Sequence, residues 1–140
     1  MRRSFPGVCV GLALVMLGAA GCDEKTDTPT TPTTPTPTVT ESFTGTLNRN
    51  GAQTFSFSVS ATGQVTATLA ELGSSGVPIS LSLGNWNGTT CQVVLANDNA
   101  KQGTLVTGTM SAAGTLCLRV YDAAGSLESA ATFKVDVVHP

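Results

Sequence analysis

The sequence is poor in charged and aromatic side chains and holds a single histidine, His139. Of its 140 residues, 11% are charged and 5% are aromatic. Seven basic residues stand against nine acidic ones, so the clustered basic face that a nucleic-acid-binding protein needs is missing. One histidine leaves little for acid–base chemistry near neutral pH. The composition therefore predicts a protein that does not bind nucleic acid, uses no cofactor and is not an enzyme.

The common hydrolase motifs are also missing. The sequence contains no Gly-x-Ser-x-Gly elbow, no His-Glu-x-x-His zinc motif and no glycine-rich phosphate loop. His139 precedes the last residue, at an end of the chain that we expect to fray. Glycoside cleavage needs a pair of carboxylates, which would have to come from Glu41, Glu71, Asp98, Asp122, Glu128 and Asp136. No sequence pattern singles out a pair among these six residues.

The beginning of the chain is typical of an export signal. Arg2 and Arg3 precede the apolar run of residues 8–20, which is thirteen residues long. A permanent membrane helix takes about 20 residues, so this run fits the apolar region of a signal peptide better than a transmembrane anchor.

The apolar run ends in Ala19-Ala20-Gly21-Cys22 and is followed by acidic residues. This stretch resembles the lipobox of bacterial lipoproteins, with Ala19 in place of the usual leucine. The resemblance implies that residues 1–21 are removed and that Cys22 is acylated. The alternative is ordinary signal cleavage that leaves Cys22 as a free thiol. Two or more acyl chains give stable membrane attachment, so we predict a bacterial cell-envelope protein anchored outside the cytoplasm, in the periplasm or at the surface.

Residues 22–40 are predicted to form the anchor cysteine and a linker. Nine threonines and four prolines lie between residues 26 and 40. Such a segment buries no apolar surface and does not offset its ordering entropy. The prolines favour an extended chain, with a reach of up to about 55 Å for eighteen residues.

Residues 41–140 show the patterns of a folded β domain. Residues 54–60 and 64–69 alternate apolar and polar side chains, and so do residues 79–83, 116–121 and 133–138. Alternation with period two indicates strands with one buried face, which are typical of antiparallel sheets. With less regular runs at 43–47, 91–96 and 104–110, the spacing predicts about eight strands in a sandwich or barrel.

These strand sequences resemble the bacterial pre-peptidase C-terminal domain. The most recognisable piece is the strand from Gly114 to Asp122, GTLCLRVYD, in which Leu116 replaces the usual aromatic residue. The resemblance covers nearly all of residues 41–140. It implies a jelly-roll-like antiparallel β-sandwich, of a kind appended to many secreted peptidases.

Two of the four cysteines remain once Cys9 leaves with the signal and Cys22 is acylated. In an exported protein, Cys91 and Cys117 most simply form a disulfide. Alternation places Cys117 on the strand face opposite to that of Leu116 and Leu118, so the bond is expected on an outer sheet surface or near a strand end. A reactive thiol is the alternative, but no histidine neighbours either cysteine in sequence.

Asn97, Asp98 and Asn99 form the one oxygen-rich cluster. Calcium binds such oxygens, and some collagen-binding domains similar to this family hold calcium at loop acids. The simpler interpretation is an Asx-type turn between strands, within the turn expected at residues 97–103. We therefore predict no metal, with calcium at these residues as the weaker alternative.

Trp86 is the only tryptophan, and it lies between Asn85 and Asn87, with glycines at 84 and 88. An exposed indole beside amide groups is a platform on which a sugar ring or a partner side chain can stack. The simpler interpretation, which we favour, is that Trp86 caps the end of the sandwich and is mostly buried. If the domain binds a ligand through a loop, these three residues are the candidates.

Two function classes follow from the sequence. The first is a non-enzymatic, lipid-anchored envelope module that binds a peptide, protein or polysaccharide or has a structural role. The second is a stand-alone accessory domain of an exported peptidase system.

Overall fold

A computed structural model describes residues 34–73 and 76–140. The predicted signal, Cys22 and most of the linker lie outside these residues. The described part contains no helix, and therefore no helix able to span a membrane. Its strands are β1 (Val39–Leu47), β2 (Ala52–Val59), β3 (Gly63–Leu72), β4 (Ile79–Trp86), β5 (Cys91–Ala100), β6 (Leu105–Met110), β7 (Gly114–Tyr121) and β8 (Ala131–His139).

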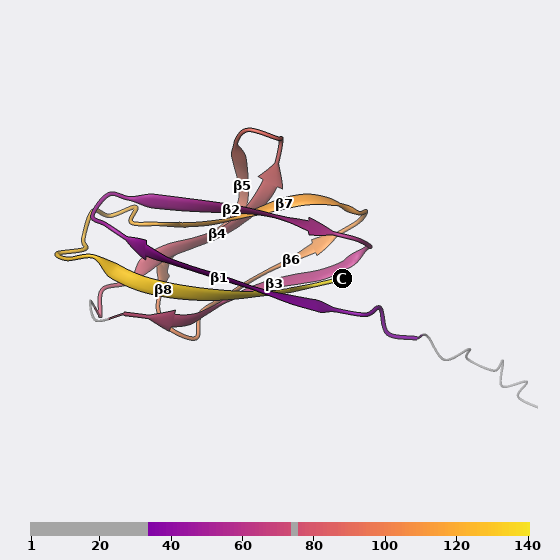
Figure 1. Cartoon of the computed structure of the whole chain (residues 1–140), viewed down its shortest axis with the longest axis horizontal. Helices are drawn as coiled ribbons and strands as arrows, with labels where there is room; N and C mark the ends of the chain where they lie inside the picture. Colours follow the sequence, from indigo (N-terminus) through magenta and orange to yellow (C-terminus); the bar gives the residue numbers. More distant parts are fainter. Residues whose placement is uncertain (1–33, 74–75) are drawn as a thin grey trace, which may run out of the picture. The chain divides into compact units, whose positions relative to one another are not determined.

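The strands form two antiparallel four-stranded sheets that pack face to face (Figure 1). One sheet has the order β1-β8-β3-β6, and the other has the order β2-β7-β4-β5. Consecutive strands alternate between the sheets in the manner of a jelly roll, except β4 and β5, which form a hairpin within one sheet. The predicted all-β, jelly-roll-like sandwich is therefore confirmed.

The alternation in the sequence decides which side chains enter the core. Leu116, Leu118 and Val120 of β7 are buried in the core. Phe133 and Val135 of β8 are buried in the same core. Side chains at i and i+2 share one face of a strand, so each sheet contributes one apolar face. The aromatic part of the core is the cluster of Phe43, Phe55, Phe57 and Phe133, with ring centroids 5.1–6.2 Å apart.

The ends of two strands differ from the expected ones. β1 begins at Val39, four residues before the expected run at 43–47, because its first residues pair with the end of β8. β5 continues to Ala100, although the turn was expected to start at Asn97. The pairing of β4 with β5 shifts register between Ile79 and Leu81, so residues 98 and 99 form a bulge inside the strand.

Asp122 ties together two connections at one end of the sandwich. Its carboxylate accepts hydrogen bonds from the backbone N–H groups of Asn50, Ser126 and Leu127 at 3.1–3.2 Å. Burial acts to raise the pKa of Asp122, but the N–H groups outweigh it and hold the pKa below its usual value. The last residue of the 114–122 motif thus joins the β1–β2 turn to the loop after β7.

Candidate binding site on the β4–β5 hairpin

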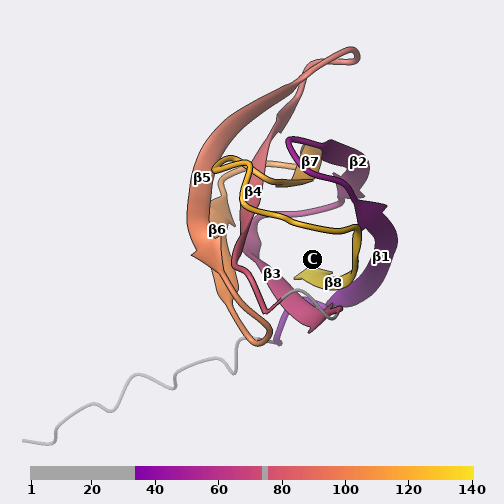
Figure 2. The same ribbon diagram turned by 90° about the vertical axis from the view of Figure 1, so that its left-hand side faces the viewer.

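The hairpin of β4 and β5 leaves the sandwich at Gly84. The pairing of β4 with β7 ends at Asn85, whereas its pairing with β5 continues to Trp86. The β4–β5 register shifts between Leu83 and Gly84, and a Cβ at Gly84 would collide with the carbonyl of Gln92. Figure 2 shows the hairpin extending past both sheets and curving toward the side of β2 and β7.

A disulfide between Cys91 and Cys117 pins the hairpin to β7, with a Cα–Cα distance of 5.7 Å. β4 lies between β5 and β7 in the sheet, so the bond joins two strands that do not pair with each other. Cys117 faces outward from the sheet but is fully buried. The predicted disulfide and its place on the outer surface are therefore confirmed.

Asn87 builds the tight turn at the tip of the hairpin. Its Oδ1 accepts the backbone N–H groups of Thr89 and Thr90 at 3.0 and 2.8 Å. Its Nδ2 donates to Thr90 Oγ1 at 2.9 Å, and Gly88 takes a positive φ of 96°. The oxygen and one N–H of the Asn87 amide are therefore engaged in the turn.

Trp86 lies on the side of the hairpin that faces the outer surface of β2 and β7. It is partly buried and does not belong to the core. Together with Arg119 it lines a pocket of about 300 Å³ beneath the hairpin. The other lining residues are small or hydroxyl-bearing, and they are Ala52, Thr54, Thr89, Thr90 and Cys91.

Arg119 enters this pocket from a fixed position. Its guanidinium lies over the ring of Tyr121, 5.0 Å from the ring centroid. The Tyr121 hydroxyl in turn donates to Asp98 Oδ1 at 2.9 Å. Burial, followed by this hydrogen bond, raises the pKa of Tyr121 above its usual value. The phenol is therefore neutral at pH 7 and remains a hydrogen-bond donor.

Two of the three residues considered for calcium accept hydrogen bonds from the protein through their side-chain oxygens. Asp98 accepts from Tyr121, and Asn97 Oδ1 accepts the backbone N–H of Asn99 at 2.9 Å. The latter bond is the local Asx bond expected for a turn, here within the bulge of β5. In residues 34–73 and 76–140, no three His, Cys, Asp or Glu side chains gather as a metal site.

An apolar groove of about 330 Å³ runs along the opposite side of the hairpin, between β5 and β6. Asn85 lines this groove, so it lies across the hairpin from Trp86. The core residues Val65, Leu83 and Leu116 reach its floor. Three neighbouring apolar side chains of β5, Val93, Val94 and Leu95, are 38–65% exposed beside it.

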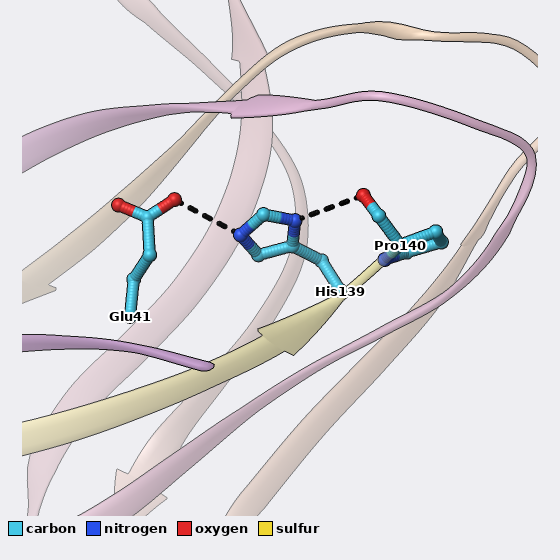
Figure 3. Close-up of polar contacts among 3 residues, drawn as sticks. All are labelled: Glu41, His139 and Pro140. Carbon is cyan, nitrogen blue, oxygen red and sulfur yellow. Dashed lines mark hydrogen bonds and ion pairs between the residues drawn. The ribbon is translucent and has the colours of Figure 1, made fainter. Parts of the chain in front are cut away.

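Glu41 and His139 form a second polar cluster at the far end of β8 (Figure 3). His139 Nε2 lies 2.9 Å from Glu41 Oε1, and Nδ1 lies 3.2 Å from the oxygen of Pro140. The ring packs against Phe57 and is 3% exposed. The expected fraying at His139 is wrong, because these contacts close the end of the sandwich. Each ring nitrogen faces an oxygen acceptor of the chain.

Besides Thr89 and Thr90 next to the hairpin tip, sequence reasoning missed Arg119 and Thr54. They lie on different strands from Trp86, and only the bend at Gly84 brings Trp86 above them. The one available signal was an arginine pointing outward from a strand in a chain with few charges.

No protein-family model and no curated protein matches the sequence. Among solved structures, the chain is similar to PliG of Aeromonas hydrophila, a periplasmic lysozyme inhibitor of g-type lysozyme. The identity is 14% and the TM-score is 0.51, over 71% of this chain and 84% of that chain. At this identity the likeness concerns the fold.

Proposed function

We propose that this protein is a lipid-anchored, non-enzymatic binding module of the bacterial cell envelope. Its ligand-contacting element is the β4–β5 hairpin. The lipobox-like sequence ending at Cys22 supports the anchor, and the threonine- and proline-rich linker would hold the domain away from the membrane. The disulfide suits an oxidising compartment outside the cytoplasm.

The observation that carries the binding role is the outer part of the hairpin, residues 84–99, which is covalently held but contributes no residue to the core. No residue between Leu83 and Ala100 belongs to the core cluster. A segment that does not stabilise the core is nevertheless pinned by a disulfide, which fixes Trp86 above Arg119. A pre-positioned pocket loses less entropy on binding than a mobile loop.

An array of bacterial envelope polysaccharides and peptides, probed with the full chain extracted in detergent, tests this proposal. We expect the binding signal to fall at least tenfold in Trp86→Ala. Val39→Thr is the matched control, because Val39 is an exposed apolar residue on β1. Binding that is equal in both variants and the parent would place the ligand elsewhere and contradict the role of the hairpin.

A protein ligand is the second candidate, and the apolar groove favours it. Exposed apolar side chains on an edge strand are typical of protein contacts, and the fold neighbour PliG is itself an inhibitor of an enzyme. The resemblance of residues 114–122 to the pre-peptidase domain supports an exported peptidase as an alternative partner. Binding assays with g-type lysozyme and with a co-exported peptidase separate this candidate from the first. Each assay compares the parent chain with Val94→Asp, the variant that alters the groove.

A further inference from the structure

We infer that the pocket beneath the hairpin binds an acidic saccharide, a sugar that carries a carboxylate or phosphate group. The inference rests on the proposed function and names the ligand class of its site. Its basis is the juxtaposition of Trp86, Arg119 and threonine hydroxyls around one pocket of about 300 Å³. This volume is at the lower end for small-ligand sites.

Arg119 forms no ion pair with a carboxylate of the described residues. Two ion pairs occur in residues 34–73 and 76–140, and they join Lys134 to Asp136 and His139 to Glu41. Asp98, on the same sheet face, accepts the Tyr121 hydroxyl instead. The planar guanidinium matches a carboxylate or phosphate through two parallel hydrogen bonds.

The remaining walls favour a sugar over an acidic peptide. Thr54, Thr89 and Thr90 provide hydroxyls that both donate and accept, which suits a ring bearing several hydroxyl groups. Trp86 provides an amphipathic aromatic surface against which a sugar ring can pack. Apart from Trp86, the lining offers Ala52 and the disulfide-bonded Cys91 as apolar contacts.

The site is already ordered in the absence of a ligand. Stacking on Tyr121 orients Arg119, and the bond to Asp98 orients Tyr121. The disulfide holds the strand that faces Trp86. The pocket also reaches β2, an edge strand, through Ala52 and Thr54. One side therefore lies at the sheet edge, where a polymer can continue past the bound sugar.

The test is a titration of the full chain in detergent, followed by calorimetry and by Trp86 emission. The probes are trigalacturonate against its neutral methyl ester, and mannose 6-phosphate against mannose. We expect one acidic probe to bind at least tenfold more tightly than its neutral partner. The difference should shrink as salt is raised from 50 to about 500 mM, since ionic contacts are screened. The acid that binds identifies the anionic group.

Arg119→Gln should remove the preference for the acidic probe, and Arg119→Lys should retain part of it because the charge remains without the planar fork. Lys101→Gln is the matched control, because it removes one positive charge from the exposed β5–β6 turn. Thermal unfolding of each variant reports whether it folds. If Arg119→Gln does not fold, the acid-to-ester ratio and its salt dependence in the parent chain decide the question.

Equal binding of acidic and neutral probes, with loss in Trp86→Ala, would overturn the acidic class while leaving the hairpin as the binding element. Arg119-dependent binding of tetraglutamate without binding of either acidic sugar would overturn the saccharide and point to an acidic peptide. No binding of any sugar probe also overturns the inference, and the array described above then judges the proposed function separately.

Discussion

Replacing both Cys91 and Cys117 by serine removes the covalent link between the hairpin and β7. The bond joins residues 26 apart in sequence. In the loop-entropy model, closing a loop of that length stabilises the folded state by about 3.5 kcal/mol. Cys117 is fully buried, so the substituted hydroxyl adds a small further cost. We expect the double variant to fold with a free energy of unfolding about 3.5 kcal/mol lower.

Urea unfolding of both proteins measures this difference, and for a domain of this size it corresponds to a fall in Tm of at least about 14 °C. Tryptophan emission adds a local readout, because Trp86 pairs directly with position 91. In the folded double variant we expect emission shifted to the red and more easily quenched, while far-UV circular dichroism stays that of a β protein.

A fall of less than about 1 kcal/mol with unchanged Trp86 emission would refute this reasoning. It would mean that non-covalent contacts alone hold the hairpin against the sheet. Alkylation of the unreduced parent protein serves as the control, since two reactive thiols from Cys91 and Cys117 would show that the bond was absent from the start.

Three further predictions concern the lipid anchor at Cys22, the buried carboxylate of Asp122 and the bend of the hairpin at Gly84. Mass spectrometry of membrane-extracted protein should show a diacylated or triacylated N-terminal peptide beginning at Cys22; an unmodified Cys22 or an intact Met1 from native cells contradicts the anchor. Asp122→Asn should lower the free energy of unfolding by about 2 kcal/mol at pH 7. Because the folded-state pKa of Asp122 lies below its unfolded value, this difference should be complete above about pH 5 and disappear as the pH falls through the folded-state pKa; a pH-independent difference contradicts it. Gly84→Ala should cost about 1–3 kcal/mol in thermal unfolding, since the new Cβ would meet the carbonyl of Gln92; an unchanged Tm would show that the bend does not depend on glycine.

Local patterns were enough to predict the sheets. The alternation at residues 116–121 predicted that Leu116 and Leu118 face inward and Cys117 faces outward, because side-chain direction in a strand depends on parity alone. The start of β1 was harder to place. Val39 lies in a threonine-rich segment whose composition suits both a linker and a strand, and only its pairing with His139 decides.

The site depended on contacts that no local pattern contains. The Asx bond of Asn97 was predicted as part of a turn, but the same bond fits a bulge within a continuing strand. The position of Trp86 above Arg119 follows from the register shift at Gly84 and from a disulfide between strands that do not pair. These are long-range consequences of packing, so the sequence could offer Trp86 as a candidate but not the residues that face it.

Quenching of the single tryptophan by acrylamide, before and after saturation with the strongest binder from the envelope array, tests the binding role of the hairpin most directly. Trp86 is partly buried at the wall of an open pocket. We therefore predict emission that is partly quenchable in the native protein and becomes protected as the ligand binds, with the same concentration dependence as binding itself. Emission that is blue and fully protected without ligand, or that does not change at saturation, would contradict a ligand site beneath the hairpin.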